Sequence, residues 1–222
     1  MKRSPLALLA PALIVLAVAS MAVGLVVSGD GYAAPPVGIP DVGGLIGWGT
    51  PVLRVLTDIA AVVTIGFLLA AVVLDPSGKD GTVSRAGRSD LIRASVAAVI
   101  WALLALAQSV FVVGNVLGLQ FSQAISPDVL TTYAFDLPTT RALFGMAILA
   151  LAISAACAAT FTVGSGAAWL ILALLAAVLP ALGGHAAGLG DHALAMTAGA
   201  AHIAAATLWI GGLLALALHA LR

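Results

Sequence analysis

The chain contains, from Ser95 to Leu119, the predominantly apolar stretch SVAAVIWALLALAQSVFVVGNVLGL, in which no residue is charged. About 20 such residues in a helix cross a bilayer core roughly 30 Å thick. Lipid offers the backbone no hydrogen-bond partners, so only helices and closed barrels cross a membrane. The stretch lacks the alternation of apolar and polar residues that a barrel strand requires. It therefore predicts a transmembrane helix.

Five further stretches on either side have the same character, being rich in Leu, Ala and Val and bounded by Gly, Pro, Asp or basic residues. They run from Leu6 to Val27, Pro51 to Leu74, Thr140 to Thr162, Ala167 to Leu182 and Ala193 to Leu221. The first follows Met1-Lys2-Arg3 and is either a signal peptide or a helix. Its apolar run of about 22 residues exceeds the usual signal-peptide core of roughly 7–15 residues, which favours the helix.

The sequence thus predicts an all-α integral membrane protein, a bundle of about six transmembrane helices. We expect a single multi-pass domain over residues 1–222. It comprises the first helix, or signal anchor, with an outer loop (1–50), helices two to five (51–182), and a histidine-containing turn with the sixth helix (183–222).

Composition excludes several classes of function. Hydrophobic residues make up 62% of the chain and charged residues 8%, where soluble domains carry about a quarter charged residues. The net charge is zero, so no basic surface argues for nucleic acid. Cys157 is the single cysteine, which excludes an intramolecular disulfide and multi-thiolate metal sites. No catalytic constellation is present, so we do not expect an enzyme.

Basic residues set the expected orientation, because cytoplasmic loops carry an excess of Lys and Arg. With the N-terminus in the cytoplasm, seven basic residues lie inside and only Arg54 and Arg141 lie outside. The outer loops then contain Asp but no Lys or Arg. A cation would approach this face without repulsion.

Polar side chains inside helices are costly in lipid and usually face the bundle interior or an aqueous cavity. Arg54 and Asp58 are one turn apart on the second helix, a spacing that allows an ion pair. Asn115 lies near the outer end of the third helix, and Arg141 opens the fourth. Together with the outer histidines, these four residues predict a polar cavity in the outer half of the membrane.

Three histidines lie near the outer face: His185 and His192 flank a Gly-rich turn, and His202 follows along the sixth helix. His192 and Met196 are one helical turn apart, and an imidazole with a thioether suits copper better than magnesium or calcium. His202 is about 15 Å from His192 if the helix begins there, while a metal bond spans about 2 Å. Either the segment before Met196 is not helical, or two sites lie in series.

The stretch Gly184-His185-Ala186-Ala187, then Asp191-His192, and then the run from His202 to Leu213, HIAAATLWIGGL, resembles the CopD family of bacterial copper transport and resistance membrane proteins. Upstream, the helix layout is similar to actinobacterial proteins that join a CopD-like region to a cytochrome c oxidase assembly region. The resemblance implies copper handling at the plasma membrane, with His185, His192 and His202 matching the family's histidines. The chain ends after its sixth helix, whereas CopD proteins usually continue with further helices.

These observations predict a multi-pass plasma-membrane protein that captures copper, as Cu(I), on its outer face through His185, His192, His202 and Met196. Its expected partners are the copper ion, membrane lipid, and a periplasmic copper-binding protein or a cytochrome oxidase assembly factor. Two alternatives stay open. One is a b-type protein in which histidines of facing helices bind haem, and the other is a metal-free structural or assembly subunit.

Overall fold

The computed structural model describes residues 5–75, 77–182 and 192–220, and it does not describe the side chains of residues 5–10, 182, 192, 193 and 195. In the part that it describes, six helices are long and apolar enough to cross a membrane, which confirms the predicted helical membrane fold. They are α1 (Pro5–Ser28), α2 (Gly43–Leu69) continued by the π-helix η1 (Ala70–Leu74), α3 (Arg85–Leu117), α6 (Pro138–Ala159), α7 (Val163–Leu182) and α8 (His192–Ala220). Two short helices, α4 (Phe121–Ala124) and α5 (Pro127–Tyr133), lie between α3 and α6.

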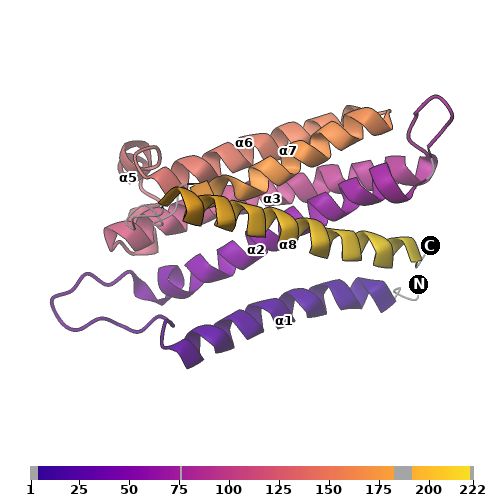
Figure 1. The fold of residues 1–222 in the computed structure, drawn as a ribbon. Helices are drawn as coiled ribbons and strands as arrows, with labels where there is room; N and C mark the ends of the chain where they lie inside the picture. The colour runs from indigo at the N-terminus through magenta and orange to yellow at the C-terminus, as the bar shows by residue number, and fades with distance from the viewer. Residues whose placement is uncertain (1–4, 76, 183–191, 221–222) are drawn as a thin grey trace.

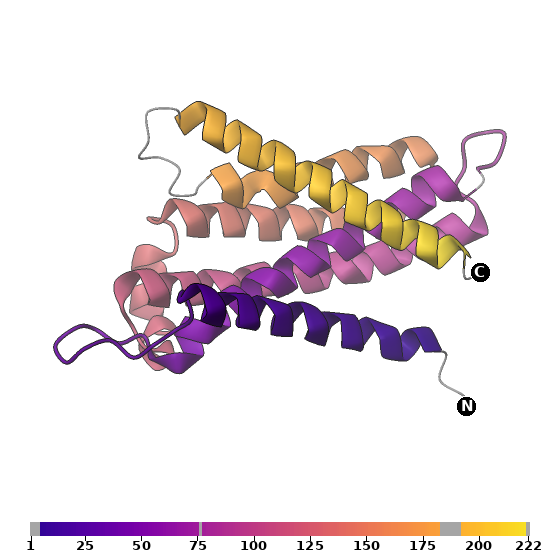
Figure 2. The same cartoon turned by 60° about the horizontal axis from the view of Figure 1, so that its bottom comes forward.

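The long helices run antiparallel to their neighbours in the chain, so the first and last helices have their free ends on the same side of the bundle (Figure 1). We call this side the termini end and the other side, which holds α4 and α5, the distal end. At the centre of the bundle, α3 packs against both α2 and α6, while α8 packs against α2 and α7. Helix α1 contacts mainly α2 and lies at the periphery in both ribbon views (Figure 2).

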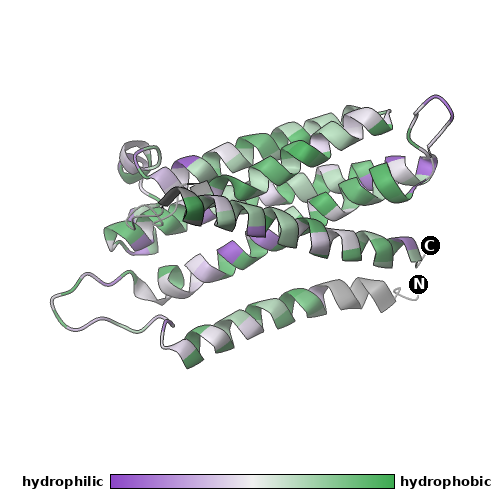
Figure 3. Ribbon diagram, viewed as in Figure 1, coloured by the Kyte–Doolittle hydropathy of each residue, from purple (hydrophilic) through white to green (hydrophobic). Residues whose placement is uncertain are grey.

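Small residues dominate the core, where alanines of five helices are buried together with a few large side chains such as Trp101, Leu143 and Ile153. Close helix approach through small residues is typical of membrane bundles, because lipid supplies no hydrophobic drive for association. Many Leu, Ile and Val side chains point outward instead, as expected for a surface that contacts lipid. In Figure 3 the helices are coloured mostly as hydrophobic, with hydrophilic residues gathered at the ends and at a few places along the helices.

Helices α2 and α3 begin well before the positions that the apolar pattern predicts, Pro51 and Ser95. Helix α2 starts at Gly43 and has Pro51 inside it. A Cβ at Gly47 would lie 2.3 Å from the Tyr32 ring, so the small residue there lets the preceding loop pack onto the helix. Helix α3 starts at Arg85, where the Ser84 hydroxyl accepts a hydrogen bond from the Gly87 amide at 3.0 Å and caps the helix. Local caps and loop packing therefore extend helices beyond their membrane-spanning parts.

The distal loop between α1 and α2 is held by one carboxylate. The Tyr32 hydroxyl donates to Asp41 Oδ1 at 2.7 Å, and the Gly43 amide donates to the same oxygen at 2.8 Å. The hydrogen bond from Tyr32 lowers the pKa of Asp41, and the same bond raises the pKa of Tyr32. The loop is thereby fixed to the first turn of α2.

At the termini end, Arg88 connects α3 to the end of α6. Its guanidinium donates to the carbonyls of Cys157 at 3.0 Å and Thr160 at 2.9 Å, and also to that of Ala158. The same group lies 4.8 Å above the ring of Phe161. The last carbonyls of a helix have no partners within the helix, so Arg88 supplies the partners that α6 lacks.

Candidate functional site

The close contact between α2 and α8 depends on two glycines. A Cβ at Gly66 would lie 2.9 Å from the Gly211 carbonyl oxygen, and one at Gly211 would lie 3.2 Å from the Gly66 nitrogen. A Cβ at Gly212 would meet nothing within 4 Å. Of the two neighbouring glycines in α8, Gly211 alone is therefore at the interface with α2, and it fixes where the two helices cross.

A cavity of about 620 Å³ lies between α2, α3, α6, α7 and α8, beyond this crossing toward the distal end. Its polar lining comes from four helices that are distant in sequence: Arg54, Thr57, Asp58, Gln108, Asn115, Thr139, His202 and Thr207. Figure 3 shows hydrophilic segments on α2 and α8 within otherwise apolar helices. Polar groups at such a depth usually face an aqueous space and serve a function.

Arg54 and Asp58 give the cavity one charge of each sign, both from α2. Among the residues that the structure describes, no salt bridge joins these two side chains, although their spacing permits one. Asp58 also lines a second, apolar pocket between α1, α2 and α8. The Asp58 carboxylate thus lines both spaces.

Two side chains with donor atoms for a soft metal line the same cavity. His202 of α8 is exposed to this space, and Met146 of α6 reaches it from a position that is only 3% exposed. An imidazole and a thioether are borderline and soft ligands, which suit copper. Across residues 5–75, 77–182 and 192–220, no group of three or more His, Cys or Asp side chains gathers as a metal site.

Gln108 contributes a buried amide to the cavity wall. The residue is 8% exposed, and its Oε1 atom has no hydrogen-bond partner among the described residues. A buried polar atom without a partner calls for a water or ligand that satisfies it. The hydroxyls of Thr57 and Thr207 bond to carbonyls of their own helices, at 2.7 and 2.6 Å.

The structure brings together four of the residues singled out by the sequence, since Arg54, Asp58, Asn115 and His202 all line the cavity. Arg141 does not line it and is exposed in the first turn of α6. Met196 is half-buried on α8 and is also absent from the cavity lining. His185 and the side chain of His192 lie outside the described part of the chain.

The start of α8 gives the spacing of two of the predicted histidines along the helix. The helix includes His192 and Met196, so the backbone between them is helical. His192 and His202 are then separated by about 15 Å along the axis, whereas each metal bond spans about 2 Å. At this separation along one helix, His192 and His202 are too far apart to bind one ion together.

Sequence reasoning did not identify Met146 as a cavity residue. It is far from His202 in the chain, and a lone methionine in an apolar helix is indistinguishable from a core residue. Gln108 and Thr207 were likewise visible only as polar residues within helices. No spacing pattern connects these positions, because the helix contacts of the folded bundle bring them together.

Comparison with known families gives one result. The model of the family described as "copper resistance protein D-like, N-terminal domain" matches residues 45–194. This range includes His185 and His192 but ends before His202 and the run that follows it, so the match falls mainly upstream of the residues on which the resemblance was based. The family is a copper resistance and transport membrane family and is not a known enzyme family. No curated protein and no solved structure matches the chain.

Proposed function

The chain belongs to the copper resistance protein D-like family, and on that premise we propose that it binds copper at the distal end of the bundle and passes it along the cavity. The observation that carries this proposal is that His202 and Met146, from α8 and α6, line one cavity together. The donor atoms of these side chains fit copper and, through the thioether, Cu(I) in particular.

The charged residues of the cavity have complementary roles in this proposal. Asp58 supplies a negative charge that offsets the charge of the copper ion. Arg54, one helical turn away, offsets the carboxylate when no cation is bound, since an isolated charge at this depth is costly. Asn115 and Gln108 add amide oxygens that satisfy a partly hydrated ion.

Copper would reach the cavity through a first site at the start of α8. His192 and Met196 are one turn apart there, and His185 precedes them in the chain, so these three residues form the proposed outer site. His202 and Met146 form the second site, deeper in the bundle. Two copper sites in series fit ion transport better than copper storage.

We place the distal end on the outer face of the plasma membrane and the N-terminus in the cytoplasm. The loops of the distal end, residues 29–42 and 118–137, contain four Asp and no Lys or Arg, as expected for outer loops. A periplasmic copper-binding protein or a cytochrome oxidase assembly factor is the proposed partner for delivery.

Metal analysis with a visible absorption spectrum of the purified chain tests the proposal. We expect bound copper and no Soret band. A Soret band would instead identify a haem protein, and the absence of both copper and haem would identify a metal-free subunit.

Replacing Met146 by Leu tests the cavity itself, because the change removes the thioether and keeps the volume. We expect the Cu(I) affinity to fall at least about tenfold, the smaller effect known for changes beside a metal ligand. Met21, in the peripheral helix α1, provides the matched Met→Leu control, which should bind copper like the unmodified chain. Equal affinities of the two variants would remove Met146 from the site.

A further inference from the structure

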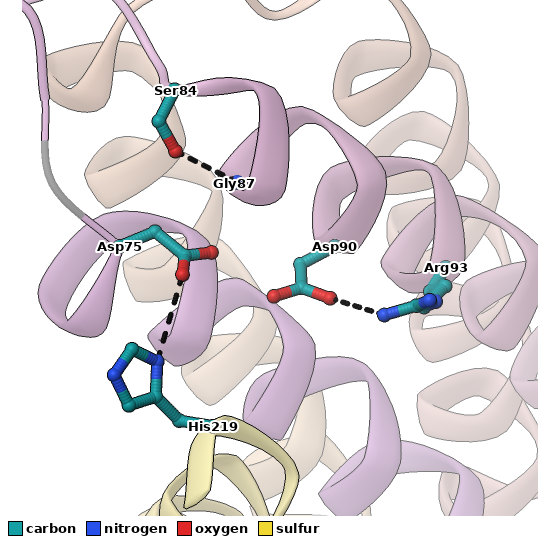
Figure 4. Close-up of polar contacts among 6 residues, drawn as sticks. All are labelled: Asp75, Ser84, Gly87, Asp90, Arg93 and His219. Carbon is teal, nitrogen blue, oxygen red and sulfur yellow. Dashed lines mark hydrogen bonds and ion pairs between the residues drawn. The ribbon is translucent and has the colours of Figure 1, made fainter. Parts of the chain in front are cut away.

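The termini end of the bundle holds two buried carboxylates that the copper path does not use. Asp75 follows η1 directly, and its side chain is 2% exposed. Asp90 lies in the second turn of α3, and its side chain is fully buried. Figure 4 shows both carboxylates on neighbouring elements, with one oxygen of Asp90 directed toward Asp75.

Each of these carboxylates has a half-exposed basic partner. His219 Nδ1, near the end of α8, lies 3.7 Å from Asp75 Oδ1, and the His219 side chain is 48% exposed. Arg93 Nη1 donates to Asp90 Oδ1 at 2.9 Å, and the Arg93 side chain is 50% exposed. The basic groups therefore reach the solvent, while the acids that they contact do not.

The two basic partners differ in chemistry. A guanidinium stays protonated at every physiological pH, so the pair of Arg93 and Asp90 keeps a constant charge. An imidazole gains and loses a proton near neutral pH. Among the described residues of this end, His219 combines an ionisable ring that reaches the solvent with a contact to a buried carboxylate.

The elements near His219 carry further charged groups. The loop before α3 carries Lys79 and Asp80, and Asp80 accepts a hydrogen bond from the Thr82 hydroxyl at 2.7 Å. Helix α3 adds Arg85 and Arg88, of which Arg88 is bound to the carbonyls at the end of α6. In their described parts, α1 and α7 contain no acidic or basic residue.

We infer that Asp75 and His219 form a proton-binding site that exchanges protons with the solvent at the termini end. One proton binds to the imidazole, forms an N–H bond there, and converts a neutral ring beside a carboxylate into an imidazolium–carboxylate pair. Loss of that proton to water reverses the change, and no other bond forms or breaks. A charged pair attracts more strongly than a neutral ring and a carboxylate, so the bound proton holds the end of α8 against η1.

The site is built on the two elements that also carry the distal cavity. Helix α2 runs without a break into η1 and Asp75, while α8 carries His202 and, farther along, His219. Between the two ends, the helices meet at Gly66 and Gly211. The proton site and the cavity thus share one pair of helices, and the proton site itself does not depend on copper binding.

A histidine titration by NMR tests this inference on the purified full chain. The ring signals of His219 are assigned by their loss in His219→Gln, and their change with pH is then followed. In Asp75→Asn, which keeps the shape and removes the negative charge, the pH dependence of the His219 ring signals should differ from that of the unmodified chain. Asp80→Asn, which removes an exposed carboxylate of the same end, should leave that pH dependence unchanged.

If the His219 ring signals change with pH in Asp75→Asn as they do in the unmodified chain, the inference is wrong. If Asp75→Asn does not fold, the unmodified chain provides the test. The carboxyl carbon signal of Asp75 should then shift over the same pH range as the His219 ring signals. The absence of that shift would also contradict the inference. Asp75→Asn should bind copper like the unmodified chain. The NMR titration and the copper measurement therefore test the proton site and the copper proposal separately.

Discussion

The crossing of α2 and α8 shapes the cavity, and replacing Gly211 by Ala tests it directly. The added Cβ would lie 3.2 Å from both the Gly66 nitrogen and the Val62 carbonyl oxygen. These are backbone atoms and cannot rotate away, so α8 must shift by a few tenths of an ångström. Inserting a methyl group into a packed contact typically costs about 1–3 kcal/mol.

Gly212→Ala is the matched control, because its Cβ would meet nothing within 4 Å. Both changes gain the same intrinsic preference of Ala over Gly in a helix, about 1 kcal/mol. That gain cancels when the two variants are compared, which leaves the packing cost alone. We therefore expect Gly211→Ala to be about 1–3 kcal/mol less stable than Gly212→Ala.

The assay is reversible unfolding in mixed micelles, with the helical circular dichroism signal followed as the denaturing detergent increases. The free energies of unfolding of the two variants are compared with that of the unmodified chain. Equal stabilities, or a lower stability for Gly212→Ala, would refute the crossing described here.

Three further predictions address the ends of the bundle. Arg88→Ala should lower the free energy of unfolding by about 2 kcal/mol or more, because hydrogen bonds from a charged donor to the carbonyls ending α6 are lost; an unchanged value in the micelle assay would contradict that role. The hydrogen bond to Asp41 raises the pKa of Tyr32 above its usual 10.0, so its stabilisation is complete below pH 10.0 and is lost as the pH rises through the raised value. Asp41→Ala should return tyrosinate formation, measured by ultraviolet absorbance, toward pH 10.0, and no change would show that the bond is absent. Cysteines at Val37 and Lys79 should react with an impermeant maleimide from opposite sides of the membrane, and reaction from one side only would refute the arrangement of the ends.

Much of the fold follows from composition and length alone. Runs such as that from Ser95 to Leu119 are too long and too apolar for anything but a membrane helix, and all six predicted spans are present. Helix starts were predicted less well. Gly43 to Thr50 is glycine-rich and resembles a loop, yet it is helical, because Tyr32 and Phe111 pack against its glycines. Such stabilisation comes from partners distant in sequence.

The candidate site was predictable only in part for the same reason. Arg54, Asp58 and His202 stand out because charge and imidazole are rare inside apolar helices. Met146 does not stand out in the sequence, and neither does Asp90. Its burial, and its place near Asp75 and His219, depend on how η1, α3 and α8 pack at the termini end. Periodicity within one helix carries no information about that packing.

Cu(I) binding to the purified chain, measured by competition with a chromophoric Cu(I) chelator, tests the central claim most directly. His202→Ala should lose one bound ion per chain or bind it at least about tenfold more weakly, while His219→Ala, at the other end of the same helix, should bind copper like the unmodified chain. The number of ions bound and their affinity are both read from the same titration. If His202→Ala retains the full number of copper ions at unchanged affinity, the cavity is not the copper site.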